Sequence, residues 1–140
     1  MQKRPKRRSN VLHEYSLFHQ STHQISKHFK VREFAQKDFR CDKVIVDSEL
    51  INVLEDIRTH FNKPVNVTSG YRTPEYNARI GGVKNSQHTK GTAADIKVSD
   101  IPAREVQKYL KRKYPDKYGI GSYLNFTHID IRAKKARWRG

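Results

Sequence analysis

Two histidines and two acidic residues stand in short segments whose residue types indicate a metal site. His88 and Asp95 lie seven positions apart, and His128 and Asp130 follow further along the chain. Imidazole nitrogens and carboxylate oxygens are ligands of catalytic zinc, which is typically held by about three protein groups and keeps a further position for water. The sequence therefore offers His88, Asp95 and His128 as candidate ligands of one Zn²⁺. The alternative is that the histidines are ordinary polar residues and that Asp95 caps a turn or pairs with a lysine.

Alternating apolar residues support the first interpretation. Apolar side chains alternate with Asp95 in residues 94–98, and with His128 and Asp130 in residues 127–132. Alternate side chains of a strand share one face, so each segment is predicted to bury its apolar face and to present its polar residues on the other. If the two strands are neighbours, Asp95 and His128 face one cleft.

The elements that must position these residues follow from hydrophobic spacing and from turn residues. The clearest helix is predicted from residue 47 or 48 to about 62, because apolar residues recur on one face at helical spacing. The other predicted elements are strands at 44–46, 65–69, 94–98, 118–123 and 127–132, and helices at 74–80 and 102–114. This order predicts an α+β domain with a small, mostly antiparallel sheet, helices packed around it, and the zinc site in a cleft on the sheet.

Length, charge and cysteine content limit the function further. A chain of 140 residues fits one domain, which we expect at residues 24–140 after a basic arm at residues 1–23. The net charge of +15 implies polyanionic surroundings: nucleic acid, acidic phospholipid or an anionic cell-wall polymer. Cys41, as the single cysteine, excludes an internal disulfide and a cysteine-cluster zinc site. No apolar run approaches the roughly 20 residues of a membrane span.

Three separated motifs carry a resemblance to a known family. They are Ser69-Gly-Tyr-Arg-Thr-Pro74, the segment Ser86-x-His-x-x-Gly-x-Ala-x-Asp95, and His128-x-Asp130. In this order they resemble the zinc D-alanyl-D-alanine carboxypeptidase family, which also includes L-alanyl-D-glutamate endopeptidase endolysins. The resemblance extends from about His28 to Trp138. It implies that the three candidate ligands bind one zinc ion.

The resemblance also implies roles for residues around the metal. Arg72 is expected to hold a carboxylate or carbonyl of the substrate, since a guanidinium forms forked, charge-assisted hydrogen bonds with carboxylates. Ser86 is expected to help seat the peptide, with a loop cap as its alternative role. Tyr71 and Trp138 are the aromatic residues expected to line the substrate groove.

The general base is the point at which the sequence departs from better-known relatives. Many of them carry an acid or a histidine two or three positions before the last zinc ligand, where this chain has Asn125 and Phe126. Asp130 shares a face with His128 and is the candidate catalytic base. Its alternative role is to accept a hydrogen bond from a zinc-binding imidazole and so to orient it.

Taken together, these features predict a zinc metallopeptidase that hydrolyses the peptide stems of bacterial peptidoglycan, at either a D-Ala-D-Ala or an L-Ala-D-Glu bond. We expect a monomer, with contacts to anionic wall polymers and no nucleic-acid partner. Because the basic N-terminus lacks the apolar region of a secretory signal, we expect synthesis in the cytoplasm and phage-type release, or a place in a virion, before action at the cell wall. Two alternatives remain: a non-catalytic zinc-containing module that binds the wall, and nucleic-acid binding by the basic arm and tail.

Overall fold

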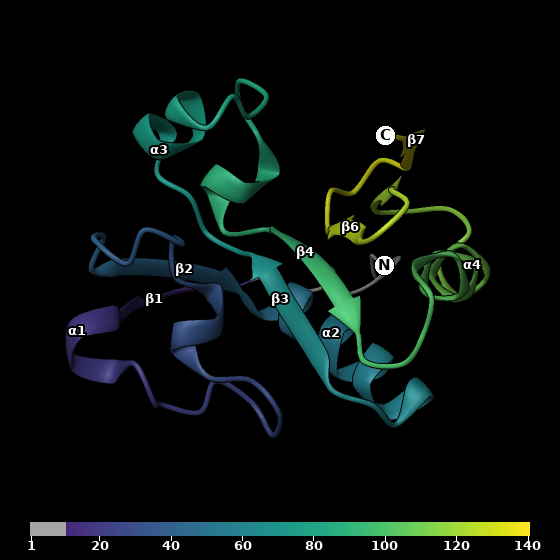
Figure 1. The fold of residues 1–140 in the computed structure, drawn as a ribbon, viewed down its shortest axis with the longest axis horizontal. Helices are drawn as coiled ribbons and strands as arrows, with labels where there is room; N and C mark the ends of the chain where they lie inside the picture. Colours follow the sequence, from purple (N-terminus) through teal and green to yellow (C-terminus); the bar gives the residue numbers. More distant parts are fainter. Residues whose placement is uncertain (1–10) are drawn as a thin grey trace, which may run out of the picture.

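The computed structural model describes residues 11–140, which form an α+β domain with two sheets (Figure 1). The predicted fold class is therefore confirmed. The elements in chain order are β1 (Leu12–Ser16), α1 (Leu17–Gln20), a 3₁₀ helix (Val31–Phe34), β2 (Lys43–Asp47), α2 (Ser48–Phe61), β3 (Val65–Ser69), α3 (Pro74–Arg79), a second 3₁₀ helix (Gln87–Lys90), β4 (Ala93–Val98), α4 (Ala103–Lys113), β5 (Gly119–Ser122), β6 (Thr127–Asp130) and β7 (Ala136–Arg139).

The main sheet has five strands in the order β3-β4-β6-β5-β7, and β1 pairs with β2 in a separate two-stranded sheet. All neighbouring strands are antiparallel except β5 and β7, which are parallel. The main sheet is thus mixed and larger than the small, mostly antiparallel sheet predicted from the sequence. The missing strand was β7, whose sequence Ala-Arg-Trp-Arg alternates apolar and basic residues over only four positions, too few for a clear strand signal.

Helix α2 forms where its apolar spacing predicts it. The Asp47 side chain caps its N-terminus by accepting a hydrogen bond from the Glu49 N–H, and Asn62 ends it in a left-handed conformation. Its buried face is formed by Leu50, Val53, Leu54 and Ile57. Figure 1 shows α2 behind β3 and β4, so the helix covers one face of the main sheet.

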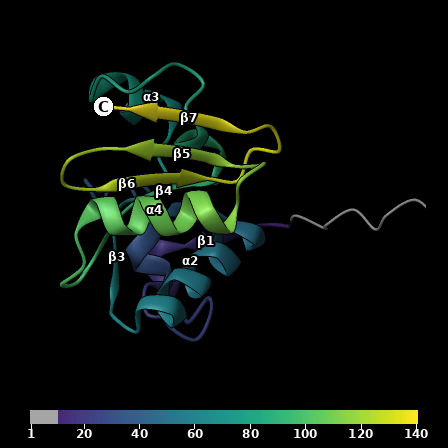
Figure 2. The ribbon, with the colours of Figure 1, turned by 90° about the vertical axis from the view of Figure 1, so that its right-hand side faces the viewer.

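The apolar face of the sheet and the apolar face of α4 join the same core. Ile96, Ile120 and Ile129 of the strands cluster with Val106 and Leu110 of α4, and all five are at most 1% exposed. Figure 2 shows α4 running alongside β6 and β4. Because helices occupy this face, the polar side chains of β4 and β6 lie on the opposite one.

The predicted basic arm falls partly outside the described residues, since positions 1–10 are not among them. Residues 12–16 form β1, which pairs in register with β2, and Leu17 is buried. This part of the predicted arm therefore belongs to the folded domain.

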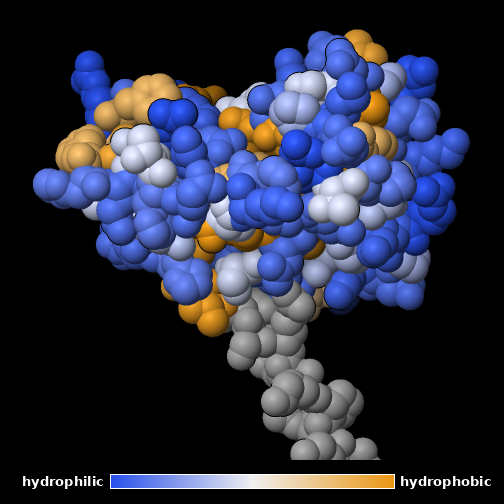
Figure 3. Space-filling view, turned by 90° about the horizontal axis from the view of Figure 1, so that it is seen from below, coloured by the Kyte–Doolittle hydropathy of each residue, from blue (hydrophilic) through white to orange (hydrophobic). Residues whose placement is uncertain are grey.

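The face of the molecule seen from below is mainly hydrophilic (Figure 3). Figure 3 shows apolar residues gathered toward the left of the face seen from below, the end at which α1 lies in Figure 1. Exposed apolar side chains in the N-terminal part include Leu12, Phe18 and Phe39. Within residues 11–140, none of the helices combines the length and the apolar character that crossing a membrane requires.

Candidate metal centre

Sheet register brings two of the candidate ligands together. Asp95 of β4 and His128 of β6 are direct cross-strand partners, so their side chains leave the same face of the sheet at neighbouring positions. His88 comes from the 3₁₀ helix that precedes β4. One ligand atom from each of the three residues lies within 4.8 Å of the others, which makes them a group able to hold a metal ion.

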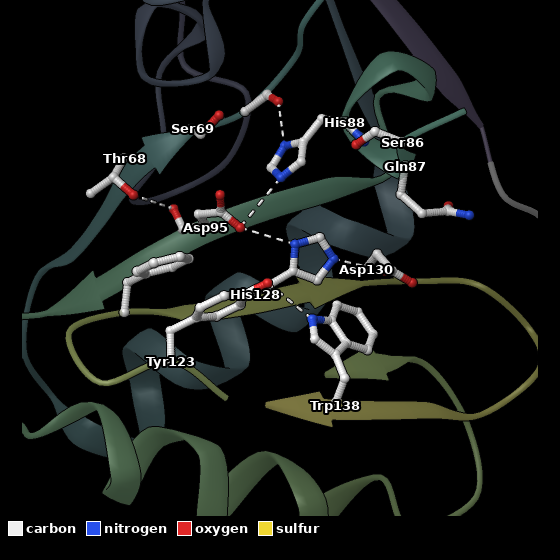
Figure 4. Close-up of polar contacts among 12 residues, drawn as sticks. Thr68, Ser69, Ser86, Gln87, His88, Asp95, Tyr123, His128, Asp130 and Trp138 are labelled. Carbon is white, nitrogen blue, oxygen red and sulfur yellow. Dashed lines mark hydrogen bonds and ion pairs between the residues drawn. The ribbon is translucent and has the colours of Figure 1, made fainter. Parts of the chain in front are cut away.

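The His88 ring is held with one nitrogen facing the site. Its Nδ1 lies 2.8 Å from the Gly70 carbonyl oxygen, which requires a hydrogen on Nδ1 and leaves Nε2 unprotonated in the neutral ring. Nε2 lies 3.3 Å from Asp95 Oδ1 (Figure 4). The His88 side chain is only 4% exposed, so the surrounding chain fixes its orientation.

The His128 ring is held in the same way from the other side. Its Nδ1 lies 2.9 Å from Asp95 Oδ1, and its Nε2 lies 2.8 Å from Asp130 Oδ2 (Figure 4). Both histidines thus have one nitrogen toward Asp95 and a hydrogen-bond acceptor on the other nitrogen. This arrangement of outer acceptors is typical of metal-binding histidines.

The donor set fits a zinc ion in both spacing and charge. Zinc bonds to nitrogen and oxygen of about 2.0–2.1 Å in tetrahedral geometry place ligand atoms roughly 3.3 Å apart. The distances from Asp95 Oδ1 are 3.3 Å to His88 Nε2 and 2.9 Å to His128 Nδ1. Two neutral imidazoles and one carboxylate would leave the positive charge of Zn²⁺ only partly neutralised, as a site that activates water requires.

Asp95 is well suited to the ionised state that a ligand needs. Burial disfavours the charged form, but the interactions with the His128 and His88 rings outweigh burial and hold the pKa of Asp95 well below its ordinary value. Asp95 therefore remains a carboxylate at any pH at which the protein is expected to act.

Asp130 is completely buried and both of its oxygens are occupied. Arg132 Nε donates to Oδ1 at 2.8 Å and Arg132 Nη2 donates to Oδ2 at 2.7 Å, while His128 Nε2 also reaches Oδ2. Burial alone would raise the pKa of Asp130. The hydrogen bonds from Arg132 and His128 outweigh burial and hold this pKa well below its ordinary value. The candidate base therefore lies behind the His128 ring, in a closed Arg132–Asp130–His128 chain of hydrogen bonds.

Two glycines of β5 make this arrangement sterically feasible. Gly119 is the cross-strand partner of Asp130, and a Cβ at Gly119 would lie 2.5 Å from both carboxylate oxygens. Gly121 is the partner of His128, and a Cβ there would lie 2.7 Å from the Trp138 ring. The Gly-Ile-Gly sequence of β5 thus reserves space for Asp130 and Trp138, a signal that the sequence analysis did not use.

Arg72 is anchored beside the candidate ligands. Its Nε donates to Ser69 Oγ at 3.1 Å and its Nη1 donates to Asn77 Oδ1 at 2.9 Å. Its Nη2 lies 3.7 Å from Asp95 Oδ2. Asn77 is itself buried against Gly82, where a Cβ would lie 2.0 Å from Asn77 Oδ1. The guanidinium is therefore fixed through two nitrogens, and the third faces the site.

A cleft of about 560 Å³ opens over the three candidate ligands. Arg72, Ser86 and Trp138 lie in its wall. The Trp138 Nε1–H donates to the Tyr123 hydroxyl at 3.0 Å (Figure 4). The full lining is Arg72, Gly81, Gly82, Val83, Asn85, Ser86, Gln87, His88, Asp95, Tyr123, Phe126, His128, Arg132 and Trp138.

Ser86 lines the cleft, whereas Tyr71 does not. Ser86 Oγ accepts the His88 N–H at 3.1 Å, so this side chain caps the 3₁₀ helix while also lining the cleft. The Tyr71 side chain is buried, with 5% exposure, and is not part of the cleft lining. Contact between Tyr71 and substrate, predicted from the sequence, thus finds no support in the geometry of the cleft.

Neither Arg132 nor Tyr123 was assigned a chemical role from the sequence. Arg132 fixes Asp130 from the rim of the cleft, and its guanidinium lies over the Trp138 ring at 5.3 Å. The signal for Arg132 was present, because it continues the alternation of His128 and Asp130 on one face of the chain. Tyr123 lies in the turn between β5 and β6, where strand periodicity ends and gives no guide to direction.

Comparison with known proteins places these residues in context. The model of the family described as Peptidase M15 matches residues 27–130. The peptidoglycan L,D-endopeptidase MepK of Escherichia coli K12 is 33% identical over 102 residues, which cover 67% of this chain and 56% of that protein. The probable peptidoglycan L,D-endopeptidase MepK of Haemophilus influenzae is 28% identical over 120 residues, which cover 79% of this chain and 64% of that protein. This chain therefore spans between half and two thirds of the length of these relatives.

Proposed function

Because this chain belongs to the peptidase M15 family, we propose that it is a zinc-dependent hydrolase of a peptide bond in the stem peptides of bacterial peptidoglycan. One observation carries the proposal. Asp95 and His128 are cross-strand partners, His88 joins them from a neighbouring helix, and each imidazole has its outer nitrogen held by an acceptor. Such preorganisation is expected of ligands to a metal.

For the bond that is cut, we favour an L,D bond in an endopeptidase reaction. Support comes from the relatives, which are named peptidoglycan L,D-endopeptidases. The L-alanyl-D-glutamate bond predicted from the sequence belongs to this class. Cleavage of D-Ala-D-Ala by a carboxypeptidase reaction is the alternative.

Zinc, when bound, would supply a Lewis acid that lowers the pKa of a coordinated water to about 7 and polarises the scissile carbonyl. The chain itself supplies the means to hold the peptide. Arg72 is anchored by Ser69 and Asn77, so its free Nη2 can bind a substrate carbonyl or carboxylate without the guanidinium having to reorganise.

Asp130 is better suited to positioning than to proton transfer. Its carboxylate is buried and accepts hydrogen bonds from Arg132 and His128. We therefore assign it the role of orienting the His128 ring, in place of the role of general base predicted from the sequence. Arg132 is the second positioning residue, since it holds the Asp130 carboxylate in place.

Tyr123 is our candidate for a hydrogen-bond donor to the reacting peptide. Among the described residues of the cleft wall, Tyr123 is the only ionisable side chain besides the candidate ligands and the two arginines. Its hydroxyl oxygen accepts from Trp138 Nε1, so its own hydrogen is free to be donated to another group. A donor in this position would stabilise charge that develops on the peptide during hydrolysis.

The test is a cleavage assay on purified peptidoglycan with added zinc. The wild-type chain is expected to release new amino groups, and mass spectrometry of the fragments identifies the bond. His88→Ala is expected to lose zinc and at least about 1,000-fold in activity, because a ligand is removed. His19→Ala changes an exposed histidine outside the cleft and serves as the matched control. Equal cleavage by wild type and His88→Ala would refute the proposal.

A second candidate function is a non-catalytic, zinc-containing module that binds wall peptides. It is motivated by Asn125 and Phe126, which stand where many relatives carry an acid or a histidine, and by the occupied oxygens of Asp130. This function predicts zinc binding and binding to peptidoglycan with no bond cleaved. The same mass-spectrometric assay distinguishes the two functions.

The proposed site of action is the bacterial cell wall, with peptide stems as the substrate. The relatives described above are bacterial proteins with peptidoglycan endopeptidase names. The phage-type release predicted from the sequence has no support among them, and we do not include it in the proposal.

A further inference from the structure

A second hollow, of about 870 Å³, lies between α4, the end of β4 and the turn that joins β5 to β6. It shares Tyr123 with the metal cleft and is otherwise lined by different residues. Figure 2 shows α4 running alongside the strands that provide the remaining wall. We call this hollow the α4 cavity. The function proposed above makes no use of it.

The α4 cavity is strongly cationic. None of its lining side chains is acidic, and five are basic: Lys97 of β4, Arg104, Lys108 and Lys111 of α4, and Arg139 of β7. Within residues 11–140, only Arg104 among these five has an acidic side chain within 4.0 Å, and that contact with Glu105 is largely exposed. The other four positive charges therefore line the cavity without an ion-pair partner from the described chain.

Three of these cations form a row on one face of α4. Arg104, Lys108 and Lys111 are spaced at i, i+4 and i+7, so they lie on one side of the helix and are separated by roughly 6 Å and 4.5 Å along its axis. Like charges at such spacing destabilise a helix by a few tenths of a kcal/mol. The row therefore does not stabilise the helix, but it is well placed to bind a ligand with repeated negative charges.

The cavity also offers groups for less polar parts of a ligand. Ile101, Val106 and Leu124 line it, and Leu124 is 88% exposed. Ser122 lines it as well, and the Ser122 hydroxyl is buried without a hydrogen-bond partner in the described part of the chain. Apolar side chains beside cationic ones match a polymer of phosphate and polyol units.

We propose that the α4 cavity binds a linear phosphodiester polymer of the bacterial wall and thereby holds the protein beside its peptide substrate. The choice of a wall polymer rests on the proposed function, because Tyr123 is common to the cavity and to the cleft. Lysine presents a point charge that suits a flexible phosphate chain. Single-stranded nucleic acid is disfavoured because Tyr123 is the only aromatic residue among the described residues of the lining, and one face of its ring is already stacked on Phe126 at 4.3 Å.

The test measures binding of poly(glycerol phosphate) at several salt concentrations. Lys108→Gln combined with Lys111→Gln neutralises two cavity charges. Lys134→Gln combined with Lys135→Gln makes the same change in net charge at two exposed positions outside the cavity and is the matched control. At about 0.1 M salt we expect the cavity variant to bind about tenfold more weakly and the control to change less than threefold. The slope of log Kd against log salt should also fall by about 1.4 to 1.8 in the cavity variant, as for the loss of two phosphate contacts.

Two further arms separate this proposal from the proposed hydrolase activity and from nucleic-acid binding. Cleavage of a short soluble stem peptide should be unchanged in the cavity variant, and the His88→Ala variant should still bind the polymer. An equal loss of affinity in the cavity and control variants would overturn the proposal, because net charge alone would then explain binding. Tighter binding of a single-stranded DNA of equal charge than of poly(glycerol phosphate) would also overturn it.

Discussion

The metal cleft and the α4 cavity lie on the same domain and handle charge in opposite ways. In the cleft, Asp95, Asp130 and Arg132 are mostly buried and each is bonded to named partners at short distance. In the cavity, lysines such as Lys108 and Lys111 are exposed and have no acidic partner in the described chain. A paired and buried group acts through its exact position, whereas exposed charges act through their sum. The comparison therefore predicts that a substitution that changes only a few atoms in the cleft has a large effect. Removal of one charge from the cavity is predicted to have a small effect.

Among the substitutions that test this comparison, the largest effect is expected from a methyl group at Gly119. In Gly119→Ala the new Cβ would overlap the Asp130 carboxylate and displace Arg132. We expect the free energy of unfolding to fall by about 2 kcal/mol, as for overpacked cores, and zinc to bind about 100-fold more weakly. Chemical denaturation and a competition assay for zinc measure the two effects. Ser122→Ala, in the same strand, is the control, and an unchanged zinc affinity in Gly119→Ala would contradict the prediction.

Asp130→Asn separates positioning from proton transfer. The amide keeps the shape of the side chain but loses the charge-assisted bonds to Arg132 and His128, so zinc affinity is expected to fall by about 10- to 100-fold. A positioning role predicts that activity recovers substantially when zinc is raised to saturation. Asp116→Asn, an exposed acid outside the cleft, is the control. Full zinc occupancy with no activity would instead identify Asp130 as the general base.

Tyr123→Phe tests whether the Tyr123 hydroxyl contributes to hydrolysis in the metal cleft or to polymer binding in the α4 cavity. Because the hydroxyl is proposed to donate to the reacting peptide, kcat should fall about tenfold or more while KM changes little. Binding of poly(glycerol phosphate) should not change, since the ring remains. Tyr76→Phe alters a tyrosine outside both hollows and serves as the control. A fall in polymer binding without a fall in kcat would reverse the assignment.

A single cavity charge should have a small effect. In Lys111→Ala we expect polymer binding to weaken by about two- to threefold at 0.1 M salt, because one exposed contact of about 0.5 kcal/mol is lost. The loss should disappear as salt is raised, which titration calorimetry can follow. A loss of tenfold or more from this one substitution would indicate a specific contact rather than summed charge.

An effect on stability alone is expected away from both hollows, where Glu55 of α2 holds the preceding loop. Ser26 and the backbone and ring of His28 bond to its carboxylate. Burial opposes ionisation, but these hydrogen bonds outweigh it and lower the pKa of Glu55 below 4.5. A lowered folded-state pKa contributes stability above pH 4.5 that is lost as the pH falls through the folded-state value.

The matching experiment compares urea unfolding of wild type and Glu55→Gln across pH. Wild type should be more stable by about 1 kcal/mol at pH 7, and the difference should shrink toward pH 3. Glu75→Gln, an exposed acid on α3, is the control. A difference that is constant with pH would show that packing, and not charge, is responsible.

Much of the site was accessible from local pattern. The alternation around Asp95 and His128 predicted that both residues share a face of the sheet, and the register pair confirms it. The helical spacing of residues 47–62 likewise predicted α2 within one residue at each end. These predictions succeed because backbone geometry alone sets the periods of a strand and a helix.

Other features depend on contacts between distant segments and have no local signature. Strand β7 pairs in parallel with β5, which brings Trp138 over Gly121 and into the cleft wall. Two of its four residues are basic, and an alternation of apolar and basic residues over so short a segment does not identify a strand or its partner. Tyr71 is the converse case: it neighbours Arg72 in the motif, but packing turns its side chain into the protein interior.

The residue types and their alternation decide which groups are able to bind a metal and which face of each strand they occupy, because these properties need only the chemistry of the side chains and the geometry of one strand. The pairing of β4 with β6 decides that Asp95 meets His128, and the folding of β5 and β7 beside them decides that Asp130 is enclosed with Arg132. Because Asp130 is enclosed, this candidate base is a buried carboxylate that is hydrogen-bonded to both Arg132 and His128. Its enclosure depends on which strands become neighbours, and the free energy that selects those neighbours comes from burial of the whole core.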